Sequence, residues 1–570
     1  MFLRKSINKK TGRTYLSIVH SYWNSQEKKN RSTVIKSIGY LDDLEKEHSD
    51  PIAFFTQEAI EMESQRLKDN SDYSFSIKKS ESLPIGTTNR KNFGYVAFSK
   101  IYHELGIHTF LTNRQRHSKE VYDADSVMKM LVFLRLLSPS SKKKSFEDRT
   151  RLFEKDNYSL DDVYRCLSFL NKHKDKLQIW LNERIKENYG RDTSLVYYDV
   201  TNYYFETDKT DDFKKRGVSK EHRPNPIVQM GLFIDNNGIP ITYQLFPGNT
   251  NDCLTYRPNL SRIKTEYNLG KVVVVADKGM TTGDNIWYTL SAKDGYVFSM
   301  SVRGADKELK NYVLDEAGYE WLGTEYKRKS RLYPRTINVS AANGKKLKKA
   351  VDEKQVVFYS EKYAKKAKVE REMLISKAQD LIANPGKYTR STSYGAAGYI
   401  KNIDFDKETG EILSTGKALQ LDLEKLKEDE ALDGFYVIAT SEYKESDDKI
   451  IDMYRGLWKI EESFRVTKSD LEARPVYVSR EEHIQAHFLT CFVALVIARI
   501  LEMKTENKYS VTKLLESLSK AECTHVHQNY YIFDYYDEIL KDIGEKINID
   551  FSKKMLSLRE IKKYFGMVKK

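Results

Sequence analysis

The stretch Ser194-Leu-Val-Tyr-Tyr-Asp-Val200 has the β-branched and aromatic residues of a strand, and it places Asp199 near the strand's carboxyl end. The run Lys271-Val-Val-Val-Val-Ala276 is typical of a strand buried on both faces of a sheet, and it delivers Asp277 at its end. The other elements predicted here are strands at 227–234, 239–246 and 295–302, a hairpin turn at 235–238 and a helix at 252–267.

Hairpin-linked strands followed by a helix and a central strand are the element order of a ribonuclease-H-like sheet. In that order the first and fourth strands pair in the centre of the sheet, so we expect Asp199 and Asp277 to lie side by side. Two carboxylates at adjacent strand ends repel each other unless a cation lies between them. The sequence therefore predicts an α/β fold with a cation site at this end of a mixed sheet.

A helix is predicted for Tyr454-Arg-Gly-Leu-Trp-Lys-Ile-Glu-Glu-Ser-Phe-Arg-Val-Thr-Lys468, after a buried strand at 435–440. Because a helix turns about 100° per residue, side chains seven residues apart return almost to the same face. The side chains expected on one face are Tyr454, Glu461, Arg465 and Lys468. A carboxylate flanked by a phenol and two cations suits a divalent metal beside a phosphate backbone. Glu462 is a rival carboxylate, but it faces about 80° away from Tyr454, which favours Glu461.

Composition and charge agree with a nucleic-acid partner. The 570 residues are 31% charged and 40% hydrophobic, as in folded globular proteins, and the net charge of +13 favours a polyanion. Four widely separated cysteines give no disulfide framework, which indicates a reducing cytoplasm. The most apolar stretch, 489–501, is short and is interrupted by Arg499, so we expect no membrane span.

The length of the chain suggests about three or four domains. The predicted segments are an N-terminal β-rich module at 1–90, a helical module at 91–190, the two parts of a ribonuclease-H-like catalytic domain at 191–300 and 431–505, a basic β-rich insertion at 301–430 between those parts, and a mostly helical C-terminal region at 506–570. The basic turn 142–144 makes the helical module a candidate for DNA binding, and a plain packing domain with a solvated lysine loop is the alternative.

Asp199, Asp277 and Glu461 form the candidate catalytic triad. Two Mg²⁺ ions held by three carboxylates activate a water or a 3′ hydroxyl on one side of a phosphodiester and stabilise the leaving oxygen on the other. We expect Mn²⁺ to substitute for Mg²⁺. Such chemistry needs no covalent protein intermediate, because the metals and their positioning lower the barrier.

The segments around the triad resemble the DDE transposases of bacterial insertion sequences. The segments that carry the resemblance are Tyr-Tyr-Asp199-Val-Thr-Asn, Val-Ala-Asp277-Lys-Gly-Met and Ile-Glu461-Glu-Ser-Phe-Arg465. Within these transposases, the chain is most similar to the subgroup with a Tyr-Arg-Glu-Lys signature and a β-rich insertion before the glutamate. The signature arginine falls at Leu457 here, and Arg465 is better placed than Arg455 to replace it.

The resemblance implies a metal-dependent enzyme that cleaves the ends of its element and joins them to target DNA. Its partners would be double-stranded DNA, both the terminal inverted repeats and the target, in a bacterial cytoplasm in association with the nucleoid. Two ends must be brought together, so a homodimer is expected in the DNA complex. The alternatives are a ribonuclease-H-like nuclease that only cleaves and a DNA-binding regulator derived from a transposase. The complete triad disfavours the regulator, and the basic insertion favours transposition over cleavage alone.

The DNA contacts are predicted from two regions. Tyr454, Arg465 and Lys468 are expected to contact phosphates near the cut, and their alternative is a solvent-facing stripe of ion pairs. In the insertion, Trp321 lies beside the basic pair Lys327 and Arg328. Transposases of this subgroup flip a base from the end of the element, and a tryptophan can stack on such a base. Packing is the alternative role for Trp321.

Overall fold

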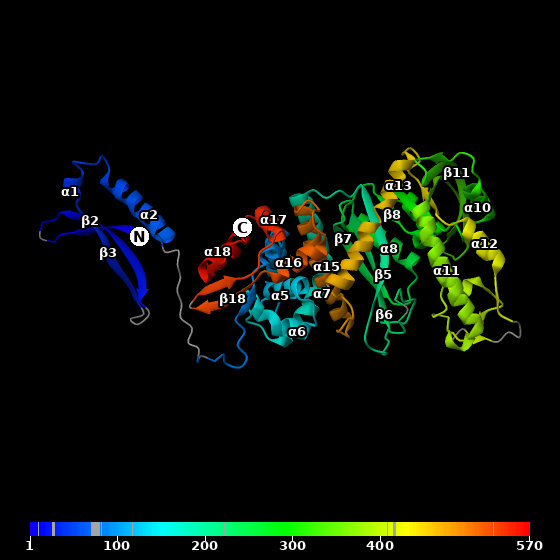
Figure 1. Ribbon diagram of the computed structural model, residues 1–570, viewed down its shortest axis with the longest axis horizontal. Helices are drawn as coiled ribbons and strands as arrows, with labels where there is room; N and C mark the ends of the chain where they lie inside the picture. The colour runs from blue at the N-terminus through cyan, green and yellow to red at the C-terminus, as the bar shows by residue number, and fades with distance from the viewer. Residues whose placement is uncertain are drawn as a thin grey trace. The chain divides into compact units, whose positions relative to one another are not determined.

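The computed structural model describes residues 1–9, 11–24, 29–69, 80, 82–116, 118–221, 223–341, 343–390, 392–406, 409–413, 418–527 and 529–569 (Figure 1). The described chain divides into an N-terminal unit, Met1–Thr87, and a main unit, Thr88–Lys570. Each unit is described by itself.

The N-terminal unit is a β-sheet with a helix on one face. Its described elements are β1 (Phe2–Ile7), β2 (Thr14–Asn24), β3 (Lys29–Tyr40), α1 (Leu41–Leu44) and α2 (Pro51–Asp69). The strands are antiparallel in the order β1-β2-β3. Leu16 and Ile18 of β2 are buried, as are Phe55 and Ala59 of α2, because a small sheet needs a covered apolar face to be stable.

A long mixed sheet forms the centre of the main unit. Its described strands, in spatial order, are β10 (Glu320–Trp321), β11 (Tyr326–Ser340), β12 (Lys346–Ser360), β17 (Phe435–Thr440), β9 (Gly295–Met300), β8 (Val273–Ala276), β5 (Leu195–Tyr204), β6 (Ile227–Asp235) and β7 (Pro240–Pro247). β5, β8 and β9 are parallel, and the other neighbours are antiparallel. The order β7-β6-β5-β8-β9 confirms the predicted ribonuclease-H-like sheet.

Side chains alternate between the two faces of this sheet and bury both of them. Tyr198 and Ala276 lie on the face covered by α8 (Asp252–Glu266) and α9 (Gly283–Ser291). Their neighbours Tyr197 and Val275 lie on the opposite face, in a core shared with α13, α14 and α15. The bounds of these three helices are α13 (Asp447–Arg455), α14 (Trp458–Arg465) and α15 (Glu481–Lys504).

Helices on that second face support the catalytic strands. They are α3 (Val96–Glu104), α4 (Ile107–Gln115), α5 (Ala124–Leu137), α6 (Lys142–Glu147), η1 (Asp148–Arg151) and α7 (Leu160–Tyr189). α15 packs against both α7 and β7. α15 is long and apolar enough to cross a membrane, but 94% of its apolar window is buried inside the protein. Its apolarity on all sides is that of a core helix.

The C-terminal region packs onto the beginning of the main unit. Its elements are α16 (Val511–Lys520), β18 (Glu522–His527), β19 (Tyr530–Phe533), α17 (Glu538–Ile547), β20 (Met555–Ser557) and α18 (Leu558–Met567). β18 pairs with β4 (Arg90–Asn92), so two segments far apart in the sequence share one small sheet, β20-β19-β18-β4.

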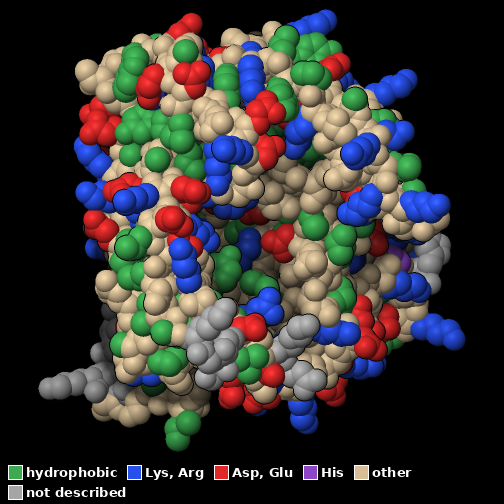
Figure 2. All heavy atoms as spheres, turned by 90° about the vertical axis from the view of Figure 1, so that its right-hand side faces the viewer, with side chains coloured by type: hydrophobic (Ala, Val, Ile, Leu, Met, Phe, Trp, Pro, Cys, Tyr) green, Lys and Arg blue, Asp and Glu red, His purple; other side chains and the backbone are tan. Residues whose placement is uncertain are grey.

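Residues 301–430 continue the central sheet through β10, β11 and β12. The other elements of this segment are α10 (Lys307–Leu314), α11 (Glu361–Ala383), η3 (Pro385–Lys387), η4 (Ala396–Tyr399), β13 (Ile400–Lys401), β14 (Asp404–Phe405), β15 (Ile412–Leu413), β16 (Gln420–Leu421) and α12 (Leu423–Ala431). Figure 2 looks onto the end of the main unit where α10, α11 and α12 lie, and shows Lys and Arg side chains spread around a hollow. The domain boundaries drawn from the sequence remain a prediction.

Candidate active site

The two predicted aspartates follow neighbouring positions of the central strands. β5 and β8 are parallel, with Tyr198 opposite Ala276, so Asp199 and Asp277 belong to the next row. The alternation of side chains places both on the face of Tyr197 and Val275, the face that α14 covers. The strand order therefore brings the two carboxylates together at one end of the sheet.

Asp199 lies where a carboxylate is costly to charge. Burial, together with the nearby carboxylates of Asp277 and Asp252, raises its pKa to about 6. The ammonium group of Lys220 and a hydrogen bond from the Val200 N–H to Asp199 Oδ1, at 2.7 Å, act in the opposite direction. A cation placed between the two aspartates would favour the ionised form of Asp199.

Two hydrogen bonds hold the carboxylate of Asp277 in place. Its Oδ1 accepts from the Lys278 N–H at 2.6 Å, at the start of η2 (Lys278–Met280), and from Ser299 Oγ at 3.0 Å. The Ser299 hydroxyl also acts on Tyr454, where it lowers the pKa of the phenol. Burial raises the pKa of Tyr454, and the charges of Asp277 and Glu461 raise it further. The Tyr454 hydroxyl therefore lies close to two of the three predicted acids.

The single helix predicted for 454–468 is wrong: the structure has three pieces there. α13 ends at Arg455, α14 begins at Trp458, and a π-helix, η5 (Val466–Asp470), follows α14. The break falls at Gly456, where a Cβ atom would collide with the Tyr197 hydroxyl, so the turn can approach the sheet only because this residue is glycine. The seven-residue spacing thus does not describe one continuous face.

Glu461 and Glu462 differ in what surrounds them. Glu461 is exposed, and its carboxylate makes no hydrogen bond or ion pair with the described residues. Glu462 Oε2 lies 3.3 Å from Nη1 of the buried Arg499, and its other oxygen lies 3.6 Å from Arg465. Glu462 is thus engaged by two arginines of the protein, whereas the carboxylate of Glu461 is available to an outside ligand.

Asp199, Asp277 and Glu461 share one property: none has a basic partner within 4.0 Å in the described part of the chain. Oxygen-only donors of this kind suit Mg²⁺ or Mn²⁺. No group of three His, Cys, Asp or Glu side chains is already gathered closely enough to hold a metal among the described residues. The donor chemistry fits a divalent ion, and Glu461 would have to approach the aspartates as the ion binds.

The predicted cations of the helical segment occupy two different surroundings. Lys468 Nζ lies 3.2 Å from Glu221 Oε1. Burial and the charge of Lys220 lower the pKa of Lys468 to about 8, while the charge of Asp199 acts in the opposite direction. Arg465 instead lies 3.1 Å from Asp470 Oδ2 and 3.2 Å from the Thr512 hydroxyl. Lys468 thus responds to the charge of Asp199, whereas Arg465 is paired away from it.

The predicted contacts in the insertion lie at the sheet edge. Trp321 is 52% exposed, on the edge strand β10. Lys327 is buried, with its Nζ 2.6 Å from Glu316 and 4.5 Å from the centre of the Tyr319 ring. Arg328 forms an ion pair with Asp448 of α13. The roles predicted for these three residues in DNA binding stay predictions.

Several residues near the aspartates were missed by the sequence reasoning. They are Lys220, Glu221, Asp252, Ser299 and Arg474. Ser299 lies on β9 and Asp252 begins α8, and both approach Asp199 or Asp277 only through the strand order. The one available signal was the adjacent charged pair at 220–221, in the connection after the first aspartate strand.

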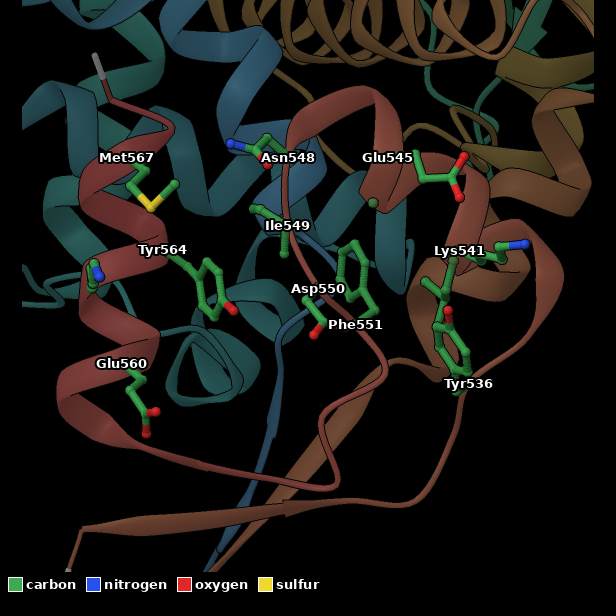
Figure 3. Close-up of a pocket in the computed structure, with 13 residues that line it drawn as sticks. Tyr536, Lys541, Glu545, Asn548, Ile549, Asp550, Phe551, Glu560, Tyr564 and Met567 are labelled. Atoms are coloured by element: carbon green, nitrogen blue, oxygen red, sulfur yellow. The ribbon is translucent and has the colours of Figure 1, made fainter. Parts of the chain in front are cut away.

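A separate pocket of about 600 Å³ lies in the C-terminal region, between α17 and α18 (Figure 3). Tyr536 and Tyr564 line it from opposite sides, with Phe551 and Met567. None of the predicted site residues is among the described residues that line it. The pocket is therefore distinct from the carboxylate site.

Comparisons with known proteins bear on this site. Residues 192–497 match the family described as the transposase DDE domain, and residues 3–72 match the N-terminal domain of IS1634 family transposases. A search of curated proteins gave no match. A piggyBac transposase synaptic complex with hairpin DNA is 8% identical, with a TM-score of 0.33 and 84% of each chain covered. A Mos1 transposase paired-end complex is 13% identical, with a TM-score of 0.14, and 43% of this chain and 66% of that one are covered.

These structural scores are low, so the fold assignment rests on the strand order and the family assignment on the DDE match. That match spans more than half of the chain and includes Asp199, Asp277 and Glu461. The chain belongs to the DDE transposases and is a DNA-cleaving and strand-transferring enzyme that depends on divalent metal ions.

Proposed function

We propose that this transposase cuts the ends of its insertion sequence and joins them to target DNA with two Mg²⁺ ions held by Asp199, Asp277 and Glu461. The observation that carries the proposal is the absence of any basic partner for these three carboxylates among the described residues. Bound divalent ions would activate the attacking hydroxyl and stabilise the leaving oxygen. Mn²⁺, which has the same ligand preference, would substitute.

The surrounding side chains have separate tasks in this proposal. Ser299 orients Asp277 through its hydrogen bond, which fixes the carboxylate before DNA arrives, and Tyr454 would contact a phosphate near the cut. Lys468, which responds to the charge of Asp199, would bind a phosphate next to the cut, and Arg465 would do so only after leaving Asp470. Trp321, Lys327 and Arg328 would act farther out, on the end of the element.

The proposed partners follow from the reaction. The enzyme would bind the terminal inverted repeats of its element and a target duplex, in the bacterial cytoplasm at the nucleoid. Two ends must be cut and joined together, so a homodimer is proposed for the DNA complex. The net charge of +13 supplies the long-range attraction to both DNAs.

The test uses the full-length protein with a duplex that carries one element end and a plasmid target. We expect cleavage and joined products with Mg²⁺ or Mn²⁺, and neither after chelation. Joined products would be absent for a nuclease that only cleaves. A regulator would bind the end and cleave nothing. Either result would overturn the proposal.

A further inference from the structure

Two cations beside the catalytic strands share one acidic partner. Glu221 Oε1 lies 3.2 Å from Lys468 Nζ, and the same oxygen forms an ion pair with the Arg474 guanidinium. Lys468 lies on η5, and Arg474 lies in the segment that leads from η5 to α15. Glu221 comes from the connection between β5 and β6 and thus links that connection to the Glu461 side of the site.

Four cations gather around Glu221. Lys220 Nζ donates to the carbonyl of Val200, next to Asp199, and the Arg223 guanidinium lies 4.2 Å from the centre of the Tyr204 ring. The four cations at this place are Lys220, Arg223, Lys468 and Arg474. Among the described residues, Glu221 is the only acid within 4.0 Å of any of them.

The two cations paired with Glu221 are also withdrawn from water. The side chains of Lys468 and Arg474 are 13% and 23% exposed. The Lys468 ammonium lies 5.6 Å from the centre of the Tyr203 ring. Partly buried cations need a firmly held anion, because the surrounding water no longer solvates them fully. Lys468 and Arg474 together therefore favour binding of an oxyanion.

We propose that Lys468 and Arg474 form a site for a DNA backbone phosphate, and that the carboxylate of Glu221 holds the place of that phosphate in the free protein. Lysine and arginine make the same charge-assisted hydrogen bonds to carboxylate and phosphate oxygens. Glu221 lies in a loop, which can move away, whereas Lys468 is fixed on a helix. The proposal rests on the proposed function, since it assumes that the strand to be cut passes Asp199.

The experiment compares Glu221→Gln with Glu206→Gln in the full-length protein. Glu206 is in the same connection, is exposed and has no ion pair among the described residues, so its substitution removes one charge without opening the site. The probe is a labelled duplex of random sequence, because a backbone contact does not depend on the bases. We expect Glu221→Gln to bind about fivefold more tightly than wild type, and Glu206→Gln to bind nearly as wild type does.

A second pair of variants assigns the gain to the proposed contacts. Adding Arg474→Ala to Glu221→Gln should remove the gain, and Arg474→Ala alone should weaken binding by an amount that shrinks as salt rises. Thermal unfolding shows which variants are folded. If Glu221→Gln does not fold, the salt dependence of DNA binding by Arg474→Ala tests the proposal alone.

Equal binding by folded Glu221→Gln and Glu206→Gln would overturn the proposal, and so would an Arg474→Ala variant with wild-type affinity. The measurement needs no metal and no cleavage, so its failure is distinct from a failure of strand transfer.

Discussion

The carboxylates of the candidate active site and two cations of the insertion, Lys327 and Arg328, differ in whether they have partners of opposite charge. Asp199, Asp277 and Glu461 have no basic partner among the described residues. Lys327 and Arg328 have acidic partners, Glu316 and Asp448, and Lys327 is buried among aromatic rings. The unpaired carboxylates are available to an outside cation, whereas the ion pairs of Lys327 and Arg328 lie within the protein.

The largest effect is expected from the acids. Asp199→Ala, Asp277→Ala or Glu461→Ala should slow end cleavage by more than about a thousandfold, since even one lost stabilising donor costs a hundred- to a thousandfold. Binding to end DNA should change little, because the basic surface supplies the affinity. Glu462→Ala is the matched control: Arg499 keeps its partner Glu502, so cleavage should stay within about tenfold of wild type. Near-normal cleavage by Glu461→Ala in Mg²⁺ would contradict the assignment.

A second prediction concerns Lys142, a buried cation without an acidic partner among the described residues. Its Nζ lies 3.2 Å from His487 Nδ1, and burial lowers its pKa from 10.5 to about 7. Between these two pH values the unfolded chain holds the extra proton, so the free energy of unfolding should rise with pH.

Urea unfolding at pH 7 and pH 9 measures this rise, which should amount to about 2 kcal/mol. The rise should be absent in Lys142→Met. A fall in the free energy of unfolding over the same pH range would show that Lys142 has an anionic partner. Lys142 would then resemble Lys327 and Arg328, which are paired with acids.

The third prediction tests whether Lys327 serves the fold or the DNA. Lys327→Ala should lower the free energy of unfolding by about 2 kcal/mol, because it removes a cation from among aromatic rings and leaves Glu316 unpaired. Lys348→Ala, at the exposed beginning of β12, should change it by less than about 0.5 kcal/mol. Unchanged stability together with a shallower salt dependence of DNA binding would assign Lys327 to the DNA.

The smallest effect is expected from Trp321→Ala. DNA binding should persist, cleavage should slow by about tenfold or less, and a fluorescent base analogue at the terminal position should no longer unstack. Leu322→Ala is the control, since Leu322 is 48% exposed beside it. If the analogue unstacks equally in both variants, Trp321 has a packing role.

The sequence was sufficient for features that local pattern determines. Periodicity and turn residues gave the order of β5, β6, β7, α8 and β8, and with it the neighbouring positions of Asp199 and Asp277. The buried strand at 435–440 was also predicted from pattern.

Features that depend on distant segments could not be predicted in this way. The turn at Gly456 lies against Tyr197 of β5, a residue more than 250 positions earlier in the sequence. Arg465 lies beside Asp470 and Thr512, and Thr512 is separated from it by all of α15. The partnership of Glu221 with Arg474 also joins two loops that only the folded chain brings together.

The pairing of β12 with β17 covers one edge of the catalytic sheet. Every residue of β17, from Phe435 to Thr440, is matched by a residue of β12. A chain that lost residues 301–430 would present β17 as a bare strand with open hydrogen-bonding groups, the kind of edge that recruits other chains into aggregates. The segment thus covers this edge of the catalytic sheet, and a shortened chain would need another cover for β17.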